Sequence, residues 1–61
     1  MDRRMELERL CIESWDKLDR TERALGIAST EASIFRAEWS AFDRAYRLLY
    51  NGRIDYYNIG V

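Results

Sequence analysis

Residues that interrupt regular structure are rare in this chain. The 61 residues include no proline, and the three glycines stand at positions 26, 52 and 60. Because these two residue types are the strongest interrupters of regular structure, the chain falls into two long uninterrupted segments and a short tail. We therefore predict one helix over about residues 2–25, a turn over 26–29, a second helix over about 30–50, and a tail over 53–61.

The first long segment has the spacing of a helix with one buried side. Small or apolar side chains recur in alternating steps of four and three residues, at Leu7, Cys11, Ser14, Leu18, Thr21 and Leu25. This alternation keeps them on one face of a helix and is typical of a seam between packed helices. Other positions carry acid-first ion pairs four residues apart, such as Asp16 with Arg20, which predict a solvated outer face.

The second long segment repeats the rhythm with larger side chains, at Phe35, Trp39, Phe42, Tyr46 and Leu49. Between the segments, Gly26 is placed to end the first helix in a left-handed conformation, with Ile27 contacting that helix. Ser29 or Thr30 is placed to cap the second helix. Helices joined by such a short connection pack as antiparallel neighbours. The predicted fold is all-α: an antiparallel two-helix hairpin over residues 1–52, followed by a short non-helical C-terminal tail.

A second apolar stripe runs along the second predicted helix, beside the aromatic one. It consists of Ile34, Ala37, Ala41, Ala45 and Leu48, and Glu38 is the charged residue within the combined apolar arc. A helix with so wide an apolar arc is buried on two sides, and a single hairpin covers only one. We therefore predict that these six residues form an interface through which two hairpins pair as a homodimeric four-helix bundle. Glu38 then either reaches water at the rim or crosses to Arg44 of the other copy.

Histidine is absent from the sequence and Cys11 is its single cysteine. An intrachain disulfide is therefore excluded, and so is a zinc site built from the usual nitrogen and sulfur ligands. Imidazole is also the commonest general acid or base near neutral pH, and Cys11 lies within an apolar seam that offers it no base. We predict no catalytic residue, no metal site, no cofactor and no small-molecule substrate.

The length of the chain limits how stable a single copy can be. A fold of 61 residues buries too little surface to be more than marginally stable alone, which favours a third element, a partner or a second copy. No stretch approaches the length of a membrane-spanning helix, and residues 1–10 lack the apolar region of a signal peptide. We therefore expect a cytoplasmic protein that does not enter a membrane.

Residues 24–33, ALGIASTEAS, resemble the turn of a helix-turn-helix DNA-binding motif through Gly26, Ile27 and Ser29. The resemblance implies a small residue four positions before the glycine, where this chain has Glu22, and base-reading side chains at the start of the second helix. The first turns of that helix instead carry mainly acidic, small and apolar side chains. The motif is therefore not the favoured interpretation.

DNA binding remains the alternative function without that motif. Three arginines share the polar side of the second predicted helix, Arg36, Arg44 and Arg47, and a dimer would double them. The chain as a whole has a formal net charge of -1, however, without the excess of positive charge that is typical of nucleic-acid binding.

The tail is unusually apolar for a chain end, with Ile54, Tyr56, Tyr57 and Ile59 within six residues. Ends of soluble domains are commonly frayed. An end with this many apolar side chains instead predicts that the tail packs against another surface. We expect the tail to fold back over the open end of the bundle near Met5 and Leu7, or else to dock on another protein.

The functional prediction from the sequence is a small non-enzymatic protein–protein interaction or assembly module. It self-associates through its second helix as a homodimer, and the dimer or its tail engages another protein. The alternative is a small DNA-binding or transcription-regulatory protein that uses the arginines of the second helix.

Overall fold

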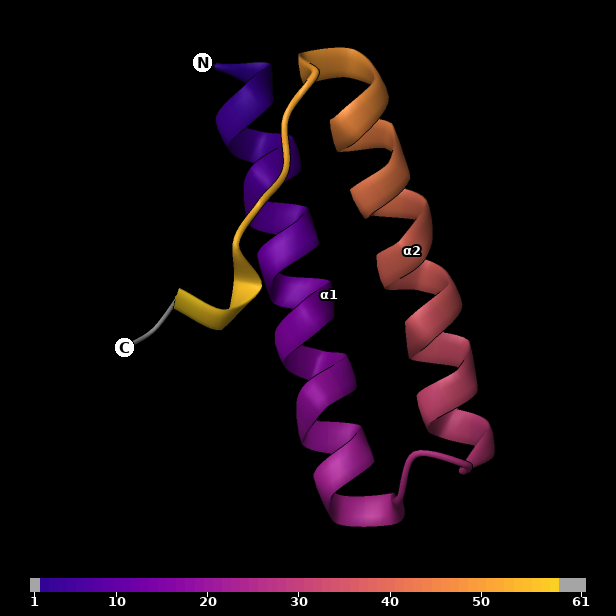
Figure 1. The fold of residues 1–61 in the computed structure, drawn as a ribbon. Helices are drawn as coiled ribbons and strands as arrows, with labels where there is room; N and C mark the ends of the chain where they lie inside the picture. The colour runs from indigo at the N-terminus through magenta and orange to yellow at the C-terminus, as the bar shows by residue number, and fades with distance from the viewer. Residues whose placement is uncertain (1, 59–61) are drawn as a thin grey trace.

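The computed structural model describes residues 2–58 and has two long antiparallel helices side by side (Figure 1). Helix α1 spans Arg3–Leu25 and α2 spans Thr30–Tyr50, and a short 3-10 helix, η1, spans Tyr56–Asn58. No β-strand occurs among the described residues. The all-α hairpin predicted from the sequence is confirmed, and both long helices begin and end within about one residue of the predicted positions.

Helix α1 has a polar cap at its start and a glycine at its end. The Asp2 carboxylate accepts a hydrogen bond from the Arg4 backbone N–H at 3.0 Å. At the other end the Gly26 N–H donates to the Glu22 carbonyl at 2.9 Å, and Gly26 has a φ of 98°, which other residues rarely adopt. Its ψ of 155° is extended, so the chain leaves α1 instead of curling back. The predicted contact of Ile27 with α1 is therefore not made, and Ile27 is exposed.

Helix α2 begins at Ser29 and ends at Asn51. The Ser29 hydroxyl accepts from the Ala32 backbone N–H at 3.2 Å and donates to the Gly26 carbonyl at 2.9 Å, so one side chain both caps α2 and holds the turn closed. At the far end Asn51 adopts the left-handed conformation, with φ 51° and ψ 42°, and its N–H donates to the Arg47 carbonyl at 3.1 Å. Asparagine tolerates that conformation better than most residues, which explains why the helix stops there.

The core lies along the middle of the hairpin and is small. The buried residues are Cys11, Ser14 and Leu18 of α1 with Ala32 and Tyr46 of α2. The Ser14 hydroxyl donates to the Cys11 carbonyl at 2.9 Å, so a polar group in the core is satisfied within its own helix. Near the open end of the hairpin, the Arg4 Nε donates to the Tyr46 hydroxyl at 3.2 Å and ties the start of α1 to the end of α2.

Two residues that the spacing placed in the core are exposed, namely Leu25 and Leu49. A repeat of seven residues drifts by about 20° per heptad around a straight helix, so Leu25, two heptads after Cys11, has rotated away from α2. Leu49 lies about 60° around α2 from Tyr46 for a similar reason, at 3.6 residues per turn. The two helices therefore bury a shorter seam than the sequence predicts.

Candidate functional site

The most exposed apolar surface on α2 is the second stripe. We call Ile34, Ala37, Ala41, Ala45 and Leu48 the outer face of α2. Ile34 is 59% exposed and Leu48 is 78% exposed, Ala37 and Ala41 are exposed, and Ala45 is half-buried. These positions fall within about 80° of the helix circumference at 3.6 residues per turn, and the exposed Leu49 extends the face toward the core. The residues predicted as an interface are therefore available at the surface of the hairpin.

Glu38 lies at the edge of this face and pairs within its own chain. Its Oε1 is 3.7 Å from the Lys17 Nζ, and both side chains remain nearly half exposed. The same Lys17 Nζ lies 4.8 Å from the centre of the Phe35 ring. Because an exposed pair of this kind contributes little stability, Glu38 is free to exchange partners, and a bond to Arg44 of another copy stays a prediction.

Two of the three arginines predicted as nucleic-acid contacts are engaged elsewhere in the hairpin. Arg36 lies 2.8 Å from the Glu22 carboxylate and donates to the Ile27 carbonyl at 3.1 Å. Arg47 lies 3.2 Å from the Asp43 carboxylate. Among the ion pairs of residues 2–58, none includes Arg44, which is exposed. Carboxylates partly neutralise this side of α2, and contact of these three arginines with nucleic acid stays a prediction.

The tail returns across α1 to the middle of the hairpin (Figure 1). Its anchor is Tyr56, whose ring stacks on Trp15 with centroids 5.1 Å apart and meets Trp39 edge-on at 5.6 Å. The Tyr56 hydroxyl donates to the Asp43 Oδ1 at 2.8 Å. Trp15 and Trp39 also contact each other, with centroids 5.1 Å apart. The tail thus packs on an aromatic cluster in mid-hairpin, and the predicted position near Met5 and Leu7 is replaced by this one.

The other tail residues predicted to dock are less engaged. Ile54 is half-buried, and Tyr57 is 83% exposed although its ring meets Trp15 edge-on at 5.9 Å. Asp55 holds the short helix η1 by accepting from the Tyr57 backbone N–H and from the Asn58 side chain. The prediction for Ile59 falls outside the described residues.

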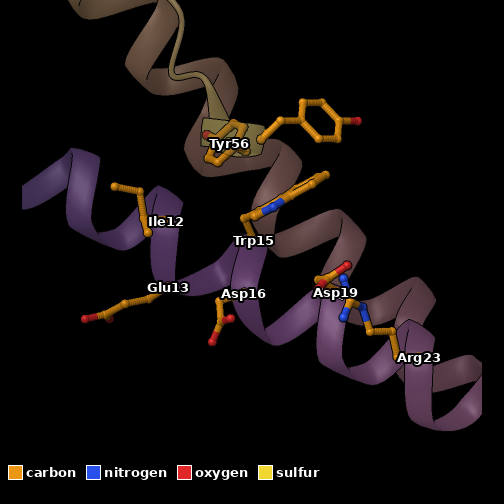
Figure 2. A pocket seen from close by; sticks show the side chains of 8 residues that line it. Ile12, Glu13, Trp15, Asp16, Asp19, Arg23 and Tyr56 are labelled. Carbon is orange, nitrogen blue, oxygen red and sulfur yellow. Dashed lines mark ion pairs between the residues drawn. The ribbon is translucent and has the colours of Figure 1, made fainter. Parts of the chain in front are cut away.

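A hollow of about 470 Å³ lies between the tail and α1 (Figure 2). It is lined by Ile12, Glu13, Trp15, Asp16, Asp19, Arg23, Tyr56 and Tyr57. In Figure 2, Glu13 and Asp16 extend away from Trp15, whereas Asp19 and Arg23 turn toward each other.

The carboxylates that line this hollow already have partners on α1. Glu13 lies 3.8 Å from Arg9, Asp16 lies 2.6 Å from Arg20, and Asp19 lies 3.1 Å from Arg23. The hollow therefore has aromatic walls and an acidic rim that neighbouring arginines neutralise. Within residues 2–58 no three histidine, cysteine, aspartate or glutamate side chains come together in a way that would hold a metal ion.

The pKa values of the Tyr56 hydroxyl and of the Cys11 thiol on α1 are both raised. Burial and the hydrogen bond to Asp43 raise the pKa of the Tyr56 hydroxyl well above its ordinary value of 10.0. Burial also raises the pKa of the Cys11 thiol above 9.0, an effect that the adjacent Tyr56 hydroxyl partly opposes. Both groups keep their protons in the folded state at a pH where the unfolded chain has lost them.

These raised pKa values predict a loss of stability at alkaline pH. Below about pH 8 the folded and unfolded chains carry the same protons on Cys11 and Tyr56, and the full stability is present. As the pH rises through 9.0 and then 10.0 the unfolded state ionises first, so the free energy of unfolding falls by up to about 1.4 kcal/mol per pH unit for each group. Urea unfolding at pH 7, 9, 10 and 11 measures this slope. In Tyr56→Phe the part above pH 10 is expected to shrink, and an unchanged slope would contradict the assignment to Tyr56.

Neither α1 nor α2, within the residues that the structure describes, has an apolar run long enough to cross a bilayer. Comparison with known proteins found no matching family model, no matching curated protein and no matching solved structure. The two candidate surfaces are therefore characterised by their geometry alone: the outer face of α2 and the aromatic cluster under the tail.

Proposed function

We propose that this protein is a small, non-catalytic assembly module that forms a homodimer through the outer face of α2. The observation that carries the proposal is the exposure of Ile34 and Leu48 at the two ends of one continuous apolar face, with alanines between them. Alanine side chains allow another helix to approach closely, and the larger residues at the ends supply apolar area. Two hairpins meeting there form a four-helix bundle with the α2 helices at its centre.

The amount of exposed surface supports a second copy as the occupant. The chain exposes 4879 Å², whereas an average folded monomer of 7.3 kDa exposes about 4,200 Å². The excess of about 700 Å² is close to the roughly 800 Å² that each partner buries in a protein–protein interface of standard size. Pairing through α2 would therefore bring the hairpin to the exposed area of an ordinary globular chain.

The composition of the core supports the same proposal. The buried apolar residues of the described chain are Cys11, Leu18, Ala32 and Tyr46, of which two are small. Such a core provides little of the apolar burial that holds folded chains together. Additional burial between two α2 helices would supply part of what the hairpin lacks. A cytoplasmic location belongs to this proposal, because Cys11 is a free buried thiol and reducing compartments preserve free thiols.

A dilution series tests the dimer directly. At high concentration we expect light scattering to give twice the mass of one chain, and on dilution we expect the mass and the helical circular dichroism signal to fall together. The melting temperature should rise with protein concentration, because assembly is linked to folding. A fully helical protein with the mass of one chain at every concentration would overturn the proposal.

A further inference from the structure

We infer that residues 52–58 form a strap that opens and closes over the hairpin as a local unit while α1 and α2 stay folded, and that Tyr56 is the latch that holds it shut. The open state uncovers Trp15 and Trp39 and gives solvent access to Cys11. This inference concerns the side of the hairpin that the tail covers and does not depend on self-association through the outer face of α2.

Within residues 52–58, the strap is held mainly by the half-buried side chain of Tyr56. Tyr56 touches both helices, through the Trp15 ring of α1 and the Asp43 carboxylate of α2. Gly52, Arg53, Asp55, Tyr57 and Asn58 are all exposed, and Ile54 is half-buried. Among residues 52–58, Tyr56 makes both the side-chain hydrogen bond to α2 and the stacked contact with α1, so releasing Tyr56 removes most of what holds this segment.

Backbone hydrogen bonds do not tie the strap to the helices. In the described chain, the last one that joins the tail region to α2 is the cap from the Asn51 N–H to the Arg47 carbonyl. Beyond it the strap bonds to itself, from the Asn58 N–H to the Asp55 carbonyl and from the Tyr57 N–H to the Asp55 carboxylate. Segments with few buried contacts and no backbone bonds to their surroundings open at a small fraction of the global unfolding free energy.

Packing around the latch is incomplete. Tyr56 lines the hollow of about 470 Å³ against α1 and a second hollow of about 310 Å³ beside α2, so open space borders its side chain where the ring is not in contact with Trp15 or Trp39. The indole N–H of Trp39 is buried and makes no hydrogen bond of normal geometry in the described chain, although the Tyr56 hydroxyl lies close to it. Opening the strap admits water to that donor, and the hydrogen bond it then forms offsets part of the free energy of separating Tyr56 from the two tryptophans.

Cys11 provides a reporter of opening. Cys11 is 0% exposed when the strap is closed, and the Tyr56 hydroxyl lies beside the Cys11 thiol. A buried thiol reacts with an aromatic disulfide reagent only after something moves away, so its reaction rate measures the population of the open state. Because Cys11 is the single cysteine of the chain, each protein molecule gives one signal.

The test is the rate at which Cys11 of the full chain reacts with dithionitrobenzoate at pH 8, in water and in urea below the unfolding transition. We expect the rate to depend weakly on urea, because local opening exposes little surface. Tyr56→Phe, which loses the bond to Asp43, should react roughly fivefold faster, and Tyr56→Ala more than about tenfold faster. The control Tyr57→Ala, at the exposed neighbouring ring, should change the rate by less than about twofold.

Two results would contradict the proposal that the strap opens locally. One is a urea dependence of the wild-type rate as steep as that of global unfolding, which would mean that Cys11 reacts only when the hairpin unfolds. The other is an equal rate in wild type and Tyr56→Phe with circular dichroism spectra unchanged. The wild-type measurement and Tyr56→Phe decide the question even where Tyr56→Ala is too unstable to use.

Discussion

Replacing Ala41 by glutamate is expected to leave the protein with the mass of a single chain. Ala41 is the middle position of the outer face of α2, and its side chain is exposed in the hairpin, so the longer residue meets no clash within one copy. In a dimer closed by a two-fold axis, the two new carboxylates lie near each other in an apolar interface. Like charges in that position cost several kcal/mol, so the dissociation constant should rise more than about a hundredfold, or about 3 kcal/mol.

The matched control for this variant is Ser40→Glu. Ser40 is also exposed, is adjacent in sequence, and receives the same charge, but it lies about 100° further around the helix, outside the outer face. Light scattering at a concentration where wild type is dimeric should therefore show a dimer for Ser40→Glu and a monomer for Ala41→Glu. Equal masses for the two variants would place any interface elsewhere than on the outer face of α2.

The helices and their ends were predictable because they depend on local chemistry. The run without proline from Arg3 to Leu25, the glycine after it and the serine before α2 each act through their own backbone or a bond within a few residues. The left-handed stop at Asn51 is equally local. Antiparallel packing followed from the short turn alone. None of these features required knowledge of how distant residues meet.

The extent of the core and the position of the tail were not predictable in the same way. A seven-residue pattern does not say whether two helices coil around each other, and in this hairpin Leu25 and Leu49 have rotated out of the contact between the helices. The tail contact between Tyr56 and Asp43 joins residues 13 apart in a segment without periodicity. Its apolar composition predicted that it would pack, yet the place where it packs depends on Trp15 and Trp39 meeting between the two helices.

The candidate interface shows the same division between local and distant effects. The angular spacing from Ile34 to Leu48 placed these residues on one face, and their exposure agrees with that spacing. No sequence pattern indicates that Arg36 reaches back to Glu22 or that Glu38 pairs with Lys17, because both contacts depend on the register between α1 and α2. Which ion pairs the long side chains of α1 and α2 form is determined only by the register in which the two helices pack.

The second large effect is expected for Leu18→Ala, which should lower the free energy of unfolding by about 3 kcal/mol. Leu18 is 3% exposed and is the largest aliphatic side chain in the core. Removing it loses apolar burial and creates a cavity, at a cost of about 3 kcal/mol for a leucine of this kind. The whole stability of a 61-residue fold is on the order of 3–9 kcal/mol. One such change therefore removes a large part of it, as the urea midpoint at one fixed protein concentration would show.

Leu25→Ala is the informative partner of this variant, because the same seam in the sequence contains both leucines. Leu25 is 57% exposed, so truncating it removes little buried area and should cost less than about 1 kcal/mol. Alanine is the best helix former, which offsets part of even that loss at the last residue of α1. A much larger effect of Leu18→Ala than of Leu25→Ala means that the seam rotates away from α2 before Leu25, as on a straight helix. Equal effects would mean that the helices coil around each other in solution and that the seam is buried to its end, contrary to the exposure of Leu25.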